Sequence, residues 1–369
     1  MPASLLRGMP KRYWVYAAIL LALALSPWWR GPAPREFRLH GGAEDMGTQF
    51  GRQARLAVRL LCRVYVKGFI CRNNETLYRK RCGEAMRLRD SLAPAYRMEL
   101  DTLAATAGVD PAAVLLGNSF IDLGFSAYGC RAVAVQTPTG MLHGHNLDWD
   151  SVGGLANWSI SLIRREPGDG RFRTVTVGLP GMIGALDIAN DQGLCLSLNQ
   201  IGFGRGATAE PVFVKLRRIA ETCATYDEAR RELLAPAPDM PFVITLSSAR
   251  EGRSGVFEPG VRGAVERPAR QGRSWADNGT WGAEVRAADS ALGQVVTAAR
   301  LESPAEVQCV LRHPQVLMGC NIYSVIFEPA RNRLHIASGR TPAAAGHYRS
   351  YELFGRPAVA PVVALARNH

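Results

Sequence analysis

The apolar pattern of the chain changes abruptly at residue 130, and this change restricts the possible folds more than any other feature of the sequence. Before it, apolar residues recur at three- and four-residue spacing over 44–70, about 78–107 and 110–124, which is typical of amphipathic helices. From Cys130 onward, turn sequences separate short alternating or apolar runs, beginning with the hairpin RAVAVQ, PTG, MLHGHNLDW. Helices first and many antiparallel strands afterwards predict an α+β fold.

Two helical stretches over about 211–234, the second opened by a capping box at Thr225, interrupt the strand-rich part. A helical pair follows over about 287–311, with a break near Ser303 and Pro304. A last hairpin is predicted over 321–339. With 47% apolar and 21% charged residues, the composition is that of an ordinary globular protein.

The first 36 residues contain an apolar run from Tyr13 to Trp29, preceded by basic residues and followed by a Pro-rich stretch. At 17 residues this run lies at the lower limit for spanning a bilayer, and a signal peptide has a similar pattern. We expect residues 1–36 to be a signal or anchor segment with a tether, an uncleaved anchor being favoured. The rest of the chain is then exported or membrane-anchored, outside the cytoplasm.

The net charge of +12 suggests an anionic partner, yet the basic residues are spread thinly and form no nucleic-acid-binding motif. We therefore expect no nucleic-acid partner. The eight cysteines form no C-x-x-C pair and have no histidines at metal-ligand spacing, so neither a metal nor another cofactor is expected. In an exported domain, Cys62, Cys71 and Cys82 could contribute to disulfides.

Cys130 has two interpretations, because it begins the first predicted strand directly after Gly129. It can be a buried thiol, or the chain can be cut between Gly129 and Cys130 so that Cys130 becomes an amino terminus. An α-amine has a pKa near 8 and can accept the thiol proton, so one residue would supply nucleophile and base. Such a site needs a carboxylate near the amine and donors for an oxyanion. Asp148 lies 18 residues later on the facing strand, and Asn199 and Asn278 carry side-chain amides, although spacing alone does not select them.

Several segments resemble those of the acyl-coenzyme A:6-aminopenicillanic acid acyltransferase-like family of N-terminal nucleophile (Ntn) cysteine hydrolases. In chain order they are EDMGTQFGRQ, ELDTLAATAGVDPAAVLLGNSF, YGCRAVAV, HGHNLDWD, DIANDQGLCLSLNQIG, ADNGTW and SVIFEPARNRLHIASGRTP. The resemblance runs from about Leu39 to the end of the chain. It implies a four-layer αββα sandwich, a single domain over 37–369, and self-cleavage into 37–129 and 130–369 that leaves the two pieces associated.

The resemblance also implies roles for single residues. Cys130 matches the nucleophile, Asp148 the carboxylate that orients the amine, Asn199 an oxyanion donor and Asn278 an asparagine near the active centre. The chain departs from the family at His145, where several relatives have Arg or Gln, and at the residue after the nucleophile, which is often Thr. The late arginine of the family has three possible matches, and the candidate substrate-binding residues are Arg131, His145, Trp149 and Arg340 (with Arg286 and Arg300 competing for the last).

The function that follows is cleavage or transfer of acyl groups at linear, non-peptide amides through a thioester on Cys130. Water would resolve the acyl-enzyme in a hydrolase and an amine in an acyltransferase, so the partner is an acyl amide or acyl donor. A basic protein at a membrane would suit lipid-like amides. Two alternatives stay open at this point: a non-catalytic, membrane-tethered binding module, and an unprocessed thiol enzyme that uses His143 or His145 as its base, with activity governed by a group near pH 6.5.

Overall fold

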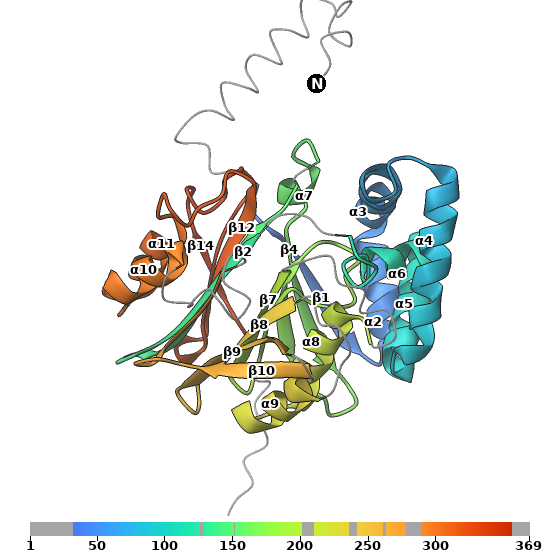
Figure 1. Ribbon diagram of the computed structural model, residues 1–369. Coiled ribbons are helices and arrows are strands. Elements are labelled where there is room, and N and C mark those ends of the chain that lie inside the picture. Colours follow the sequence, from blue (N-terminus) through green and yellow to red (C-terminus); the bar gives the residue numbers. More distant parts are fainter. Residues whose placement is uncertain are drawn as a thin grey trace, which may run out of the picture.

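The computed structural model describes residues 32–125, 129–150, 152–200, 210–235, 242–260, 263–277 and 290–355. Two β-sheets form the centre of the molecule (Figure 1). The larger sheet has the order β1-β4-β5-β6-β7-β8-β9-β10, with strands β1 (Arg35–Gly41), β4 (Ser161–Pro167), β5 (Thr174–Gly178), β6 (Asp187–Asn190), β7 (Leu194–Gln200), β8 (Phe242–Ser248), β9 (Arg253–Gly260) and β10 (Gly263–Pro268). The smaller sheet has the order β11-β2-β3-β12-β13-β14, with strands β11 (Arg273–Asp277), β2 (Cys130–Thr137), β3 (Gly140–Asp148), β12 (Asn321–Glu328), β13 (Arg333–Ser338) and β14 (Arg349–Glu352). All neighbouring strands are antiparallel except β1 and β4, which are parallel.

The two sheets pack face to face. Successive side chains along a strand point to opposite faces of its sheet, and apolar residues occur on both faces. On β2, Val133 and Val135 belong to the core under α10 (Ala291–Ala298) and α11 (Pro304–Leu311). Cys130 and Ala132 face the other sheet, and β2 contacts β7, β8 and β9. On the far side, α8 (Val212–Thr222) lies against β6 and β7, and α9 (Tyr226–Leu234) lies against β8, β9 and β10. Helices, sheet, sheet and helices thus form successive layers, and the predicted α+β class is confirmed.

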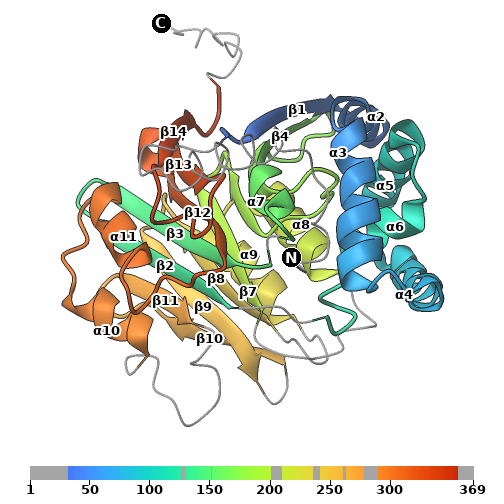
Figure 2. The same cartoon turned by 90° about the horizontal axis from the view of Figure 1, so that it is seen from above.

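The amino-terminal helices gather at the end of the larger sheet that carries β1 (Figure 2). They are α2 (Ala43–Gln53), α3 (Arg55–Leu60), the π-helix η2 (Leu61–Ile70), α4 (Glu75–Leu88), the short 3₁₀ turn η3 (Arg89–Ser91), α5 (Pro94–Ala107) and α6 (Pro111–Gly117). The single helix predicted over 44–70 is therefore three segments, and the one predicted over 78–107 is two. The second break has a clear cause, since Pro94 starts α5 at its first helical position.

Strand β1 was missed by the sequence analysis, which assigned its first residues to a tether ending at residue 36. The strand begins at Arg35 and runs parallel to β4, so the folded domain starts inside the predicted tether. The helix breaks at Asp110 and Ser303 are as predicted. Each of these side chains caps the helix that follows, and a proline occupies that helix's first turn.

No single helix in the described part of the chain has the length and apolar composition of a membrane span, although α5 and α6 pass as a pair bent by 118°. Residues 1–31 lie outside the described ranges, so the expected anchor stays a prediction.

All eight cysteines lie within the described ranges, and none of them forms a disulfide in this structure. Cys62, Cys71 and Cys82, which could have contributed to disulfides, are therefore free thiols in this structure.

Candidate active site

Cys130 is the first residue of β2, and its position follows from the β2–β3 hairpin. Cys130 pairs with Leu147 of β3, and the amide of the next residue, Asp148, donates a hydrogen bond to the Gly129 carbonyl at 3.2 Å. Asp148 therefore lies opposite the Gly129–Cys130 peptide bond. The Cys130 side chain is only 3% exposed, yet it lines a cavity between the strands and the amino-terminal helices.

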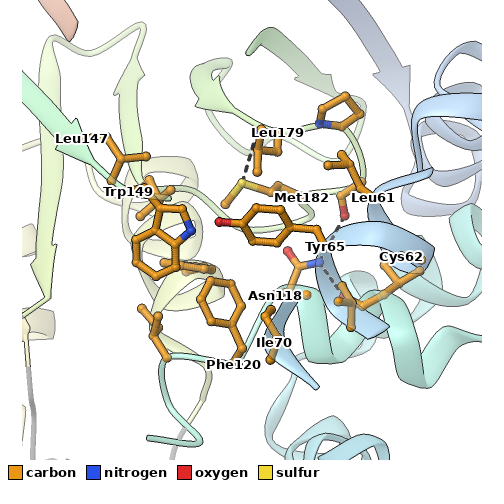
Figure 3. A pocket seen from close by; sticks show the side chains of 18 of the residues that line it. Leu61, Cys62, Tyr65, Ile70, Asn118, Phe120, Leu147, Trp149, Leu179 and Met182 are labelled. Atoms are coloured by element: carbon orange, nitrogen blue, oxygen red, sulfur yellow. Dashed lines mark hydrogen bonds between the residues drawn. The ribbon is translucent and has the colours of Figure 1, made fainter. Parts of the chain in front are cut away.

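The lining of this cavity is almost entirely apolar. Figure 3 shows Leu147 and Trp149 from the strand side facing Tyr65 and Cys62 from η2. The remaining walls come from α6 and the residues after it, the loop 179–182, and the end of β7. An aromatic wall is completed by Phe120, whose ring lies 5.5 Å from that of Trp149, measured between centroids.

The few polar groups in the lining are already engaged. Asn118 donates to the Gly181 carbonyl at 3.1 Å and accepts from the Ile183 amide at 2.9 Å, which fixes the loop that closes one side. Tyr65 donates to the carbonyl of Asp150 at 3.2 Å. Burial raises the pKa of the Cys62 thiol to about 12, so this side chain is an uncharged part of the wall. The cavity is therefore suited to a hydrocarbon chain.

Asp148 is completely buried at the end of β3. Arg131 Nη1 lies 3.7 Å from one of its carboxylate oxygens, while Arg131 Nε lies 3.1 Å from Asp277 Oδ1. The side chain of Asn321 also interacts with the Asp148 carboxylate and favours its charged form. Burial raises the pKa of Asp148 to about 7, against the opposing charge of Arg131.

A second polar group of residues lies between the sheets, on the same face as the Cys130 side chain. His145 Nδ1 is 2.9 Å from Asp187 Oδ2, and both residues are fully buried. Asp187, on β6 of the other sheet, also accepts hydrogen bonds from the hydroxyls of Tyr323 and Ser197. The sequence analysis did not single out Asp187 or Tyr323, because nothing local distinguishes them from other strand residues.

His143 lies two residues before His145 and is held differently. Its ring nitrogens contact the hydroxyls of Ser247 at 2.8 Å and Ser197 at 2.9 Å. Burial lowers the pKa of His143 to about 3, so the ring is neutral. A base with this pKa is far too weak to govern activity near pH 6.5.

Of the remaining predicted site residues in the described ranges, only Trp149 lines the cavity. Asn199 is buried near the end of β7, and its amide donates to the Ala276 carbonyl of β11, the strand next to β2, at 3.2 Å. Asn278 and Arg286 lie outside the described residues. Trp149 lines the cavity, whereas Arg131, His145 and Arg340 are not part of its lining. Arg300 is largely exposed and paired with Glu302 on the surface.

Comparisons with known proteins add context at a distance. No protein-family model matches the chain, and no curated protein is similar to it in sequence. Among solved structures, the N-acylethanolamine-hydrolyzing acid amidase ortholog of Caenorhabditis elegans is 17% identical with a TM-score of 0.48, over 61% of this chain and 100% of that one. A mutant of the conjugated bile acid hydrolase from Clostridium perfringens is 11% identical with a TM-score of 0.38, over 60% of this chain and 92% of that one. A second variant of the same enzyme is 12% identical with a TM-score of 0.37, over 63% of this chain and 100% of that one. Similarity of this degree carries no function to this chain, which has to be inferred from its own geometry.

Proposed function

We propose that this protein is an N-terminal-cysteine amidohydrolase that cuts its own chain between Gly129 and Cys130 and then cleaves linear acyl amides through a thioester on Cys130. The observation that carries the proposal is the position of Cys130. Its side chain lines an apolar cavity, while its backbone nitrogen belongs to the peptide bond that lies opposite the buried Asp148.

The apolar lining supports the substrate class. A hydrocarbon chain in the cavity would be removed from water at about 25 cal/mol per Å² of buried area, so acyl-chain binding would provide most of the affinity. The acyl carbonyl would then lie at the strand end of the cavity, next to the Cys130 sulfur. The amine half of the substrate would point out of the apolar region.

Self-cleavage would begin with attack of the Cys130 sulfur on the Gly129 carbonyl carbon. The Gly129–Cys130 C–N bond breaks, the acyl group moves to sulfur, and water hydrolyses the thioester to leave a Gly129 carboxylate and a Cys130 amine. At neutral pH most of this amine is an ammonium. Asp148 is placed to receive it, because this buried residue lies opposite the Gly129–Cys130 peptide bond.

In turnover, the neutral amine of Cys130 would accept the thiol proton and the thiolate would attack the substrate carbonyl. Asn199 and Asn278 would stabilise the oxyanion, and the ammonium would return its proton to the leaving amine. Water would then hydrolyse the acyl-enzyme. An amine that took the place of water would make the protein an acyltransferase, through the same intermediate.

The proposal is tested by intact-mass spectrometry and by activity of the Cys130→Ala variant. The native chain should yield a fragment that begins at Cys130, and N-acyl amides of graded chain length should be hydrolysed. Cys130→Ala should remain one chain and lose at least roughly 10⁴-fold in kcat/KM. A non-catalytic binding module would instead stay uncut and keep its ligand affinity after this substitution.

A further inference from the structure

We infer that His145, held by Asp187, acts as a fixed cation beside the Cys130 sulfur and stabilises its thiolate form. This inference rests on the proposed role of Cys130 as nucleophile. It makes His145 and Asp187 positioning residues for the thiolate. The α-amine of Cys130 would still accept the thiol proton.

The strand register places the three side chains together. Cys130 pairs with Leu147, and His145 precedes Leu147 by two residues, so His145 lies diagonally across the hairpin from Cys130 on the same face. Asp187 approaches from β6 in the opposite sheet and holds His145 Nδ1 at 2.9 Å. The other ring nitrogen, Nε2, is buried and makes no well-aligned hydrogen bond with a described residue. The Cys130 thiol is one of the groups that interact with the His145 side chain.

The charge of His145 follows from its surroundings. Burial lowers its pKa, but the charge and hydrogen bond of Asp187, with a smaller contribution from Cys130, outweigh burial and raise the pKa of His145 to about 10. The pKa of Asp187 is lowered, because His145, Ser197 and Tyr323 outweigh its own burial. The pair is therefore an imidazolium and a carboxylate at neutral pH.

The other titratable groups around His145 do not supply a competing positive charge. His143 on the same strand is neutral, and Tyr323 on β12 is an uncharged phenol that donates to Asp187. Asp148, three residues further along β3, lowers rather than adds to the local positive charge when it is ionised. Arg131 donates to the Cys130 carbonyl and pairs with Asp277, and its side chain lies on the opposite face of β2 from that of Cys130, so His145 is the cation on the side of the sulfur among the described residues.

An imidazolium with this pKa cannot serve as a general base near pH 7, since it already holds its proton. It stabilises a neighbouring thiolate, as low-pKa cysteines beside a charged histidine show. This matters most before cleavage, when the Cys130 nitrogen is an amide and cannot accept a proton. The thiol proton would then leave to water, and the cation would keep an appreciable thiolate fraction for attack on Gly129.

The test is the pH dependence of Cys130 alkylation by iodoacetamide, measured on peptides by mass spectrometry. Intact and processed chains are distinguished in one sample, because only the intact chain gives a peptide that spans Gly129 and Cys130. In the intact native chain we expect a rate that is nearly constant from about pH 6 to pH 8. With Asp187→Asn or His145→Gln, the rate should rise about tenfold per pH unit and be roughly 10–100-fold lower at pH 6.5.

His143→Gln is the matched control, because it removes a buried imidazole from the same strand face without removing a charge. It should keep the flat profile, as should His145→Arg, which keeps a cation. Should Asp187→Asn fail to fold, the pH profile of Cys130 alkylation is measured instead in the native chain and in Tyr323→Phe, which removes one hydrogen-bond donor to Asp187.

A native thiol that titrates like an ordinary cysteine, or a flat profile retained in His145→Gln, would overturn the inference. These outcomes differ from a failure of the proposed function. A flat native profile without self-cleavage or amide turnover would refute the proposed function and leave the thiolate assignment standing.

Discussion

Asp148 is a buried carboxylate next to the proposed cleavage site. It is completely buried, its nearest described cation is 3.7 Å away, and its pKa is raised to about 7 by burial. The folded pKa lies above the unfolded value near 4, so the folded chain binds this proton more tightly. Its contribution to stability is therefore lost as the pH rises from about 4 to about 7.

This sign leads to a prediction for the unprocessed chain, which Cys130→Ala would preserve. Adding Asp148→Asn to Cys130→Ala should raise the free energy of unfolding at pH 8 by about 1–4 kcal/mol, because a buried carboxylate is replaced by a neutral amide. The difference should disappear near pH 4. Urea unfolding at the two pH values measures it, and a decrease in stability at pH 8 would contradict the prediction.

The same substitution in the native background should have the opposite consequence for activity. Once Cys130 is an amino terminus, Asp148 would hold its ammonium, so Asp148→Asn should lower kcat by roughly 10²–10³-fold. Alkylation of the Cys130 thiol should persist. Unchanged kcat in a processed Asp148→Asn protein would remove Asp148 from the proposed mechanism.

The hairpin register explains how much of the site could be predicted from single residues. Alternation over RAVAVQ and MLHGHNLDW, with a short turn between them, was enough to place Asp148 on the strand facing Cys130, and the structure pairs these strands from Cys130 to Thr137. Asp187 could not be found in this way. It reaches His145 from the other sheet, 42 residues along the chain, and such a contact is set by how the sheets stack and not by local pattern.

At the scale of elements, the cavity depends on η2. Its residues from Leu61 to Ile70 form one wall, facing the strands that carry Cys130 and Trp149. The sequence predicted one continuous helix over 44–70, and this run contains no proline to signal a break. The change to a π-helix has no signal in the apolar periodicity of this run.

The position of Cys62 in this wall predicts that a larger side chain there affects long and short acyl amides differently. Figure 3 places Cys62 on the side of the cavity away from Leu147 and Trp149, where the far end of an acyl chain would lie. Cys62→Phe should therefore lower kcat/KM for long acyl amides by about 10–100-fold and leave short ones nearly unchanged. The control is Leu60→Phe, since Leu60 is 46% exposed and is not part of the lining. Equal losses for short and long substrates would contradict this orientation of the chain.

At the scale of the whole molecule, the proposed cut divides the chain without dividing the fold. Residues before Gly129 supply β1, which is hydrogen-bonded to β4 along the edge of the larger sheet. They also supply α5, which carries the buried Glu99. Glu99 lies 2.7 Å from Arg217 on α8 and 3.5 Å from Arg165 on β4, and all three are buried. The two processed pieces should therefore elute together in size-exclusion chromatography and separate only in denaturant.

Glu99 provides the sharpest test of this association, because it is the acid that joins two buried arginines across the cut. Glu99→Gln leaves both guanidinium groups with less buried negative charge, and breaking a buried pair in this way costs about 3–5 kcal/mol. The control is Glu84→Gln, since Glu84 pairs with Arg81 within α4 on a partly exposed surface, where the expected cost is about 0–1 kcal/mol. Native mass spectrometry of the processed protein in rising urea compares the dissociation midpoints of the two variants.

Acid should also weaken the association of the two pieces. The pKa of Glu99 is lowered, because Arg217 and Arg165 outweigh its burial. The stability that Glu99 contributes is therefore present near neutral pH and is lost as the pH falls below about 4. Pieces that separate at neutral pH without denaturant, or equal midpoints for Glu99→Gln and Glu84→Gln, would show that the contacts across the cut do not hold the molecule together.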